Sequence, residues 1–300
     1  PDSVTSIGKS VFYNCRSLTS ISIPDSVTSI GYKAFSSCGG LTSITVARGN
    51  PVYHSSGNCI IETDSKTLIV GCNNSVIPTD GSVTSIGQYA FYDCISLTSI
   101  EIPDSVTSIG SYAFTGCSRL ASIAIPDNVT SIGQYAFYDC SRLTSITIGN
   151  GVTSIGDEAF GWCSELSAVY ITDVAAWCKI HFYDEAANPL GHGRNLYLNG
   201  ELVTDLVIPG SVISIGNYAF YDCNSLTSVT IPGSVISIGD SAFYSCSDLT
   251  NVTIGNGVTS IGDSAFDSCS SLTSVTIPDS VTSIGDSAFY SCSDLTNVTI

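Results

Sequence analysis

The 300-residue sequence predicts an α/β repeat solenoid, in which short units stack along one axis. A 23-residue unit recurs ten times, and its clearest copy reads I-P-D-S-V-T-S-I-G-D-S-A-F-Y-S-C-S-D-L-T-N-V-T. One cysteine marks each copy: Cys15, Cys38, Cys94, Cys117, Cys140, Cys163, Cys223, Cys246, Cys269 and Cys292. A period of this length indicates stacking, because each unit buries its apolar face only against its neighbours.

Composition agrees with a long, thin core and excludes some partners. Hydrophobic residues make up 43% of the chain and charged residues only 12%. The net charge is −17, from 9 basic and 26 acidic residues, which argues against nucleic acid and anionic membrane surfaces as partners. No run of 18 apolar residues occurs, so we expect no membrane insertion within this segment. Proteins, glycans and cations remain as ligand classes.

The spacing of the cysteines divides the chain into regular and irregular parts. Regular repeats cover residues 1–45, 77–170 and 208–300, and variant or inserted repeats occupy 46–76 and 171–207. We expect a single solenoid over residues 1–300. Because the chain opens in mid-repeat, lacks methionine and ends on the first residue of another unit, we interpret it as a piece of a longer protein. Its uncapped ends predict some self-association.

The first element of each unit is predicted to be a short strand. In the last copies, Leu272, Val275 and Ile277 follow an L-x-x-V-x-I pattern. Val275 and Ile277 are two residues apart and therefore share one face, which we assign to the core. Ser274 and Thr276 then point outward. Stacked copies of this strand form a parallel sheet.

A second, shorter extended segment should follow. Pro278 lacks a backbone donor and ends the first strand. Val281 and Ile284 then return apolar side chains to the core, before Gly285 permits a sharp turn. Each unit therefore has two extended sides before its last element.

The last element of each unit is predicted to be a short helix. Asp286 is placed to cap the helix start, and Ala288, Phe289 and Cys292 form an apolar stripe over about one and a half turns. Packed helices lie roughly 8–10 Å apart, whereas stacked strands lie about 4.8 Å apart. The helix side should therefore fan out, so that the sheet becomes concave and the helices convex.

The repeat unit resembles that of a known family. The unit I-P-x-S-V-T-S-I-G-x-x-A-F-x-x-C-x-x-L-T-S-I closely resembles the BspA-like, or Treponema pallidum-type, leucine-rich repeat, and it covers nearly the whole chain. The resemblance implies a right-handed superhelix with a parallel sheet on the concave face and short helices on the convex face. It also implies an extracellular or cell-surface location, and adhesion to host matrix proteins such as fibronectin and fibrinogen.

Ten cysteines at one repeat position do not predict a disulfide framework. Equivalent side chains in stacked units point the same way at a spacing of about 4.8 Å. A disulfide needs Cβ atoms about 3.5–4.5 Å apart with their bonds turned toward each other. We therefore expect a ladder of buried free thiols.

The two irregular parts predict local hairpins. Asn58 to Cys72 has apolar runs on both sides of a polar turn at residues 64–66, which is typical of a hairpin. Cys59 and Cys72 are candidates for a disulfide across it, although two separate buried thiols are favoured. In the second part, residues 174–180 predict a short amphipathic helix, and Asn199-Gly200 predicts a tight hairpin.

No residue pattern indicates catalysis. Cys178, His181 and His192 have metal-ligating atoms, but their spacing is not that of a zinc site. The recurrent Asp residues after Ile-Pro and Ile-Gly suit turns and caps, with weak calcium binding as the alternative. We expect a non-enzymatic protein with no catalytic residues, no cofactor and no metal.

The outward positions of the main strands are the best candidates for a binding face. This strand face is small and rich in hydroxyls, and it carries few of the aromatic and Arg anchors that dominate protein interfaces, with Glu101 and Tyr170 as exceptions. The candidate residues are Ser99, Glu101, Ser122, Ser145, Thr147, Tyr170, Ser228, Thr230, Asn251 and Thr253. We expect a protein-binding or adhesion module whose partner is a protein, such as a host extracellular-matrix protein. The alternatives are a structural spacer that presents another domain and, less favoured, a hydroxyl lattice that binds glycan or ice.

Overall fold

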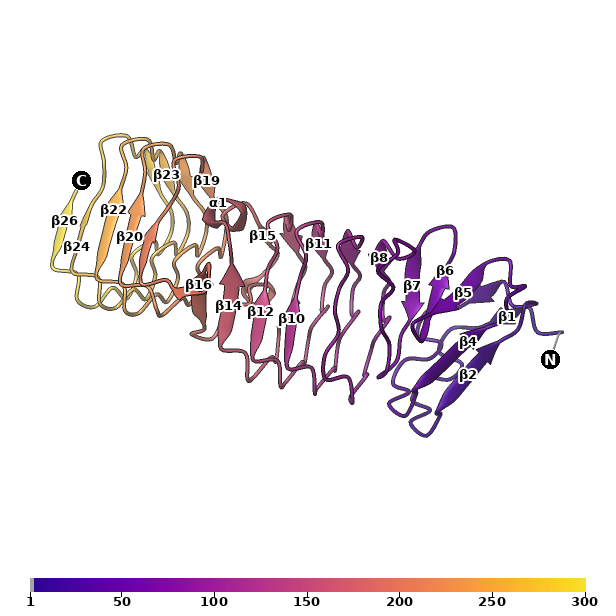
Figure 1. The fold of residues 1–300 in the computed structure, drawn as a ribbon. Coiled ribbons are helices and arrows are strands. Elements are labelled where there is room, and N and C mark those ends of the chain that lie inside the picture. The colour runs from indigo at the N-terminus through magenta and orange to yellow at the C-terminus, as the bar shows by residue number, and fades with distance from the viewer. Residues whose placement is uncertain (1–2) are drawn as a thin grey trace. The chain divides into compact units, whose positions relative to one another are not determined.

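A computed structural model describes residues 3–300 of the protein (Figure 1). The chain forms two compact units. The first comprises Pro1–Gly151 and Gly156–Leu166, and the second comprises Val152–Ile155 and Ser167–Ile300. Both consist mainly of very short parallel strands joined by tight turns.

In the first unit, each regular repeat contributes a main strand, a two-residue strand or both. The main strands are β2 (Ser20–Ile23), β4 (Ser43–Val46), β10 (Ser122–Ala124) and β12 (Ser145–Thr147). The two-residue strands are β1 (Ser6–Ile7), β3 (Ser29–Ile30), β8 (Ser85–Ile86), β9 (Ser108–Ile109) and β11 (Ser131–Ile132). The irregular part adds β5 (Tyr53–Ser56), β6 (Cys59–Glu62) and β7 (Thr67–Val70).

The second unit repeats this plan. Its main strands are β14 (Ala168–Ile171), β16 (Asn195–Leu198), β18 (Asp205–Val207), β20 (Ser228–Ile231), β22 (Asn251–Ile254), β24 (Ser274–Thr276) and β26 (Asn297–Thr299). Its two-residue strands are β13 (Ser154–Ile155), β15 (His181–Phe182), β19 (Ser214–Ile215), β21 (Ser237–Ile238), β23 (Ser260–Ile261) and β25 (Ser283–Ile284). The irregular part adds helix α1 (Val174–Trp177), the 3-10 helix η1 (Glu185–Ala187) and β17 (Glu201–Leu202).

The two extended sides of each repeat are confirmed. Main strands pair in parallel at the repeat register, so that Ser228 of β20 lies beside Asn251 of β22 and Val229 beside Val252. Val229 and Val252 are buried, whereas Thr230 is exposed, as the alternation of the strand requires. The two-residue strands pair in the same way along the second side, and Figure 1 shows β20, β22, β24 and β26 running in one direction.

The predicted helix on the third side is wrong. Ser287 and Ser291 have φ values of 57° and 55°, in the left-handed region that an α-helix cannot contain. The segment instead forms successive turns, in which the Tyr290 N–H donates to Ser287 O at 2.9 Å. Its alternate N–H groups bond to the neighbouring repeat rather than along the segment, as Phe266 N does to Ala288 O at 2.8 Å. Among the described residues, only α1 and η1 are helical.

Because this third side has no helices, the physical basis for a concave sheet and a convex helical face is also absent. The turn segments stack through direct backbone bonds, and their phenylalanine rings lie 4.9–5.4 Å apart in parallel stacks. This spacing is much closer to the strand spacing of about 4.8 Å than to the 8–10 Å of packed helices from which the curvature was predicted. The residue pattern read as a helical stripe is buried all the same, because Ala265, Phe266 and Cys269 are each 0% exposed.

The predicted helix cap at Asp286 is likewise a link between repeats. The Asp286 N–H donates to Asp263 Oδ1 at 2.8 Å, and the Asp263 N–H donates to Asp240 Oδ1 at 2.9 Å. Each carboxylate therefore satisfies a backbone donor of the next turn, which gives the recurrent Asp or Asn at this repeat position a structural role.

The cysteine ladder consists of free thiols. The Cys117 thiol donates to Phe91 O at 3.2 Å, and the same bond to the preceding repeat recurs at Cys140 and Cys246. Most members are buried, although Cys15 is exposed and Cys292 is half-buried. Burial raises the pKa of the Cys117 thiol well above its usual value, which keeps it protonated and inert.

Both irregular parts contain the predicted hairpins. β6 and β7 pair antiparallel, and β5 adds a third antiparallel strand that the sequence did not indicate. Cys59 and Cys72 are separate buried thiols. In the second unit, α1 begins after Asp173, whose side chain accepts from the Ala175 N–H, and β16 and β17 pair antiparallel across Asn199-Gly200.

Candidate functional site

Eight of the ten predicted strand-face residues lie on the main strands β10, β12, β14, β20 and β22. Ser122 pairs with Ser145 and Ala124 with Thr147 in the first unit, and Thr230 pairs with Thr253 in the second. Each predicted residue is exposed or half-buried: Ser99, Glu101, Ser122, Ser145, Thr147, Tyr170, Ser228, Thr230, Asn251 and Thr253. Ser99 and Glu101 are exposed but lie outside any assigned strand.

An aromatic pair on the strand face of the second unit provides a hydrophobic anchor. The sequence predicted one of its two members. Tyr170 of β14 lies beside Tyr197 of β16 in the parallel register, with the two ring centroids 4.8 Å apart. Leu202 of β17 faces Tyr197 across the hairpin and is 45% exposed. Tyr197 was missed because its strand belongs to the irregular part and carries no repeat signature.

Next to this pair, the second unit has a shallow hollow of about 360 Å³. Val207 on its rim is 65% exposed, and the Asp205 carboxylate accepts from the Ser228 hydroxyl at 2.5 Å. The strand face therefore combines stacked aromatic rings, exposed aliphatic side chains and an acidic group within a few strands. Such a combination supplies the anchors that a protein interface needs.

The turn side of the first unit carries a second aromatic feature, a ladder of tyrosines. Tyr89 stacks on Tyr112 at 4.8 Å, and Tyr112 stacks on Tyr135 at 4.9 Å. These residues share one repeat position, immediately before Ala-Phe, and an alignment of the repeats would have predicted the ladder. The second copy has Lys33 at this position, and its Nζ lies 4.3 Å from the centre of the Tyr89 ring, a cation–π contact.

One pair of neighbouring turn segments in the first unit departs from the regular hydrogen-bond pattern. In regular pairs, three N–H groups of one segment donate to the next, as at Tyr112, Phe114 and Gly116. Between residues 31–38 and 87–94, only the Ser37 N–H does so, to Tyr92 O at 3.2 Å. The irregular part has displaced the other two bonds.

β7 causes this displacement. It pairs in parallel with β8, and the Gly71 N–H that follows it donates to Ala90 O at 2.7 Å. In a regular pair, that carbonyl would accept from Phe35. A Cβ atom at Gly71 would lie 2.1 Å from the Phe91 ring, so only glycine allows β7 to approach so closely. The N–H groups of Lys33 and Phe35 have no hydrogen-bond partner among the described residues.

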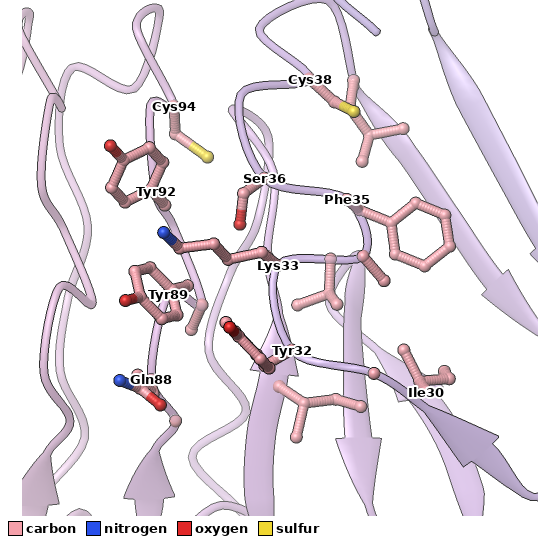
Figure 2. A pocket seen from close by; sticks show the side chains of 18 of the residues that line it. Ile30, Tyr32, Lys33, Phe35, Ser36, Cys38, Gln88, Tyr89, Tyr92 and Cys94 are labelled. Carbon is pink, nitrogen blue, oxygen red and sulfur yellow. The ribbon is translucent and has the colours of Figure 1, made fainter. Parts of the chain in front are cut away.

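The displaced segments enclose a cleft of about 230 Å³, which Figure 2 shows from close by. The side chain of Lys33 lies between the rings of Tyr89 and Tyr92. Burial raises the pKa of Tyr92 to about 12, and the Asp93 carboxylate adds to this, so its phenol stays neutral. The cleft thus has a cationic side chain, neutral phenols and an apolar interior.

The irregular part of the second unit brings no reactive cluster together. Cys178 is buried, and burial raises the pKa of its thiol to about 12. His181 and His192 are both exposed, and His181 packs edge-on against Tyr183. No three His, Cys, Asp or Glu side chains in residues 3–300 are placed to hold a metal ion. No helix in that range is long and apolar enough to cross a membrane.

Comparison with known proteins identifies the class. The family model of the BspA type leucine rich repeat region matches residues 1–59, 70–186 and 193–300, in six copies. The chain therefore belongs to the BspA-type leucine-rich-repeat family, as its repeat motif predicted. No curated protein matches the chain.

Two solved structures support the fold. A leucine-rich repeat protein from Bacteroides ovatus is similar at 28% identity and a TM-score of 0.50, over 99% of this chain and 76% of that one. A leucine rich cell surface protein from Faecalibacterium prausnitzii has the same identity and TM-score, over 99% of this chain and 83% of that one.

Proposed function

We propose that this chain is a non-enzymatic protein-binding module that acts in adhesion at the cell surface and engages its partner through the strand face. The observation that carries the proposal is the Tyr170–Tyr197 pair, set in a parallel array of exposed Ser, Thr and Asn side chains. Rigid aromatic rings flanked by small polar groups give contact area at low entropic cost.

The family supports this proposal without specifying a partner. One structural relative is described as a cell surface protein, and an extracellular location for this chain is part of the proposal. The net charge of −17 favours a partner with a basic surface, because opposite charges accelerate association. Matrix proteins such as fibronectin and fibrinogen are the first partners to test.

The test is binding of the protein to immobilised fibronectin, fibrinogen and a glycan panel. A double variant, Tyr170→Ser with Tyr197→Ser, removes the strand-face pair. A matched control, Tyr112→Ser with Tyr135→Ser, removes a tyrosine pair from the turn side whose ring centroids are 4.9 Å apart, against 4.8 Å for the strand-face pair. We expect saturable binding that the first variant loses and the control retains. Equal binding by both variants would remove the strand face from the proposal.

The second candidate function is a structural spacer that presents another domain. Its support is the uniformity of the strand face, where most outward positions are Ser, Thr or Asn. No saturable binding at high micromolar concentration to any partner in the panel would favour the spacer.

A further inference from the structure

The cleft between residues 31–38 and 87–94 is lined by residues whose hydrogen-bond donors have no acceptor among the described residues. The backbone N–H groups of Lys33 and Phe35 lack partners among the described residues, and the same groups in regular repeats donate to the next segment. The Ser36 side chain is only 6% exposed and lines the cleft, and its hydroxyl has no partner among the described residues, but its oxygen is not fully enclosed, unlike those of Ser82 and Ser234. Buried donors of this kind are rarely left unpaired in proteins.

The one charged side chain that lines the cleft is also a donor. The Lys33 ammonium group makes no ion pair and is held over the Tyr89 and Tyr92 rings, at 4.3 and 5.7 Å from their centres. Figure 2 shows it between these two rings, and the Phe35 ring points to the opposite side of the segment. The residues that line this one cleft therefore carry two backbone donors, a hydroxyl and a cation, and a carboxylate offers four acceptor sites for such donors.

The rest of the cleft is apolar and of limited size. Its apolar lining includes Ile69, Val70 and Leu41. The volume is about 230 Å³, whereas a dry cavity of about 150 Å³ already accommodates benzene. The body of the ligand is therefore an apolar ring with a short chain.

We propose that this cleft binds an aromatic carboxylate, with the ring against the apolar lining and the carboxylate on the Lys33 and Phe35 N–H groups, the Ser36 hydroxyl and the Lys33 ammonium. Two sources share this chemistry: a free aryl-alkanoic acid, and the C-terminal phenylalanine of a peptide. The inference concerns the turn side of the first unit and does not rest on the proposed role of the strand face.

The test follows backbone amide signals of the full chain by NMR while 3-phenylpropionate is added. We expect saturable shifts at Lys33 and Phe35, and none with the neutral 3-phenylpropanamide. A peptide ending in phenylalanine, with a free or an amidated C-terminus, separates the two sources. If only the peptide acid binds, the ligand is a chain terminus. If the small acid binds as well, a free metabolite suffices.

Two variants and a control test the assigned donors. Lys33→Gln removes the charge and shortens the side chain by one atom, and we expect affinity to fall at least about tenfold. Ser36→Ala should weaken binding by less. Lys9→Gln is the matched control, because Lys9 also lies over a tyrosine, 4.3 Å from the Tyr32 ring, but does not line the cleft.

Three results would overturn the inference. They are equal shifts with the amide and the acid, equal losses in Lys33→Gln and Lys9→Gln, and the absence of shifts at Lys33 and Phe35 with both 3-phenylpropionate and the peptide acid at high millimolar concentration. Each leaves the strand-face proposal intact, because that proposal is tested with protein partners and with variants in the second unit.

Discussion

Each unit contains one irregular part, residues 46–76 in the first and 171–207 in the second. In both units, an alanine carbonyl of the turn segment that follows accepts hydrogen bonds from the irregular part and not from a regular repeat. In the first unit, Ala90 O receives a backbone N–H, from Gly71. In the second, Ala219 O receives side-chain donors, from Trp177 Nε1 at 2.7 Å and Asn188 Nδ2 at 3.3 Å. The same alanine carbonyl of the repeat is satisfied in two different ways.

The two kinds of donor leave different amounts of space beside the turn segment. Trp177 and Asn188 are 1% exposed, so the second region closes with large buried side chains. The first region uses a glycine, which fills no space, and the cleft beside it contains donors without partners. A repeat array can therefore fill the space behind an irregular segment with buried side chains, as at Trp177 and Asn188, or leave a cleft beside it, as at Gly71.

The largest expected effect is at the closed region. Trp177→Ala removes a fully buried ring and leaves Ala219 O with a weaker set of donors, so we expect a loss of about 3–5 kcal/mol in the free energy of unfolding. Urea unfolding measures it. Tyr183→Ala is the control, because Tyr183 lies nearby in the chain but is 57% exposed, and it should change stability little. Equal losses would mean that Trp177 does not close the region.

A smaller loss is expected at the open region. Gly71→Ala would place a Cβ atom 2.1 Å from the Phe91 ring, and the resulting displacement should cost about 1–3 kcal/mol. Gly210→Ala is the control, since a Cβ there has no atom within 4 Å and the backbone φ is not positive. We expect the control to be neutral or slightly stabilising. A neutral Gly71→Ala would show that β7 need not pass so close.

The smallest expected effect is the contribution of one buried thiol in each region to the pH dependence of stability. Burial raises the pKa of Cys59 and of Cys178 from 9.0 to about 12. The folded state therefore holds these protons more tightly than the unfolded state. Their contribution is fully present below about pH 9 and is lost as the pH rises toward 12. Unfolding midpoints between pH 7 and 11 test this, and a decline that begins well below pH 9 would contradict it.

Much of the fold was predictable because the repeat dictates it. Val229 and Val252 on alternating strand positions, and Phe266 and Cys269 in the core, follow from hydrophobic spacing and the 23-residue period. The helix prediction failed because Ala, Phe and Cys spaced for one helical face are equally buried by consecutive turns. Ser287 and Ser291 have positive φ values, a conformation that glycine usually adopts. Because serine occupies these positions, the sequence carried no indication of the left-handed backbone.

The candidate sites were only partly predictable. The outward strand residues followed from alternation, and Tyr170 stood out among them. Tyr197 and the Lys33 cleft depend on how the irregular parts dock onto regular repeats, which periodicity cannot describe. Gly71 was the available signal for the cleft, but the need for glycine appears only when β7 is placed against Phe91.

The most direct test of the contrast between open and regular segments is amide hydrogen exchange. The Lys33 and Phe35 N–H groups have no partner among the described residues, whereas the equivalent Tyr112 and Phe114 donate to the next repeat at 2.9 and 2.7 Å. We predict that Lys33 and Phe35 exchange fast while Tyr112 and Phe114 are strongly protected. Protection of Lys33 and Phe35 equal to that of Tyr112 and Phe114 would contradict the account.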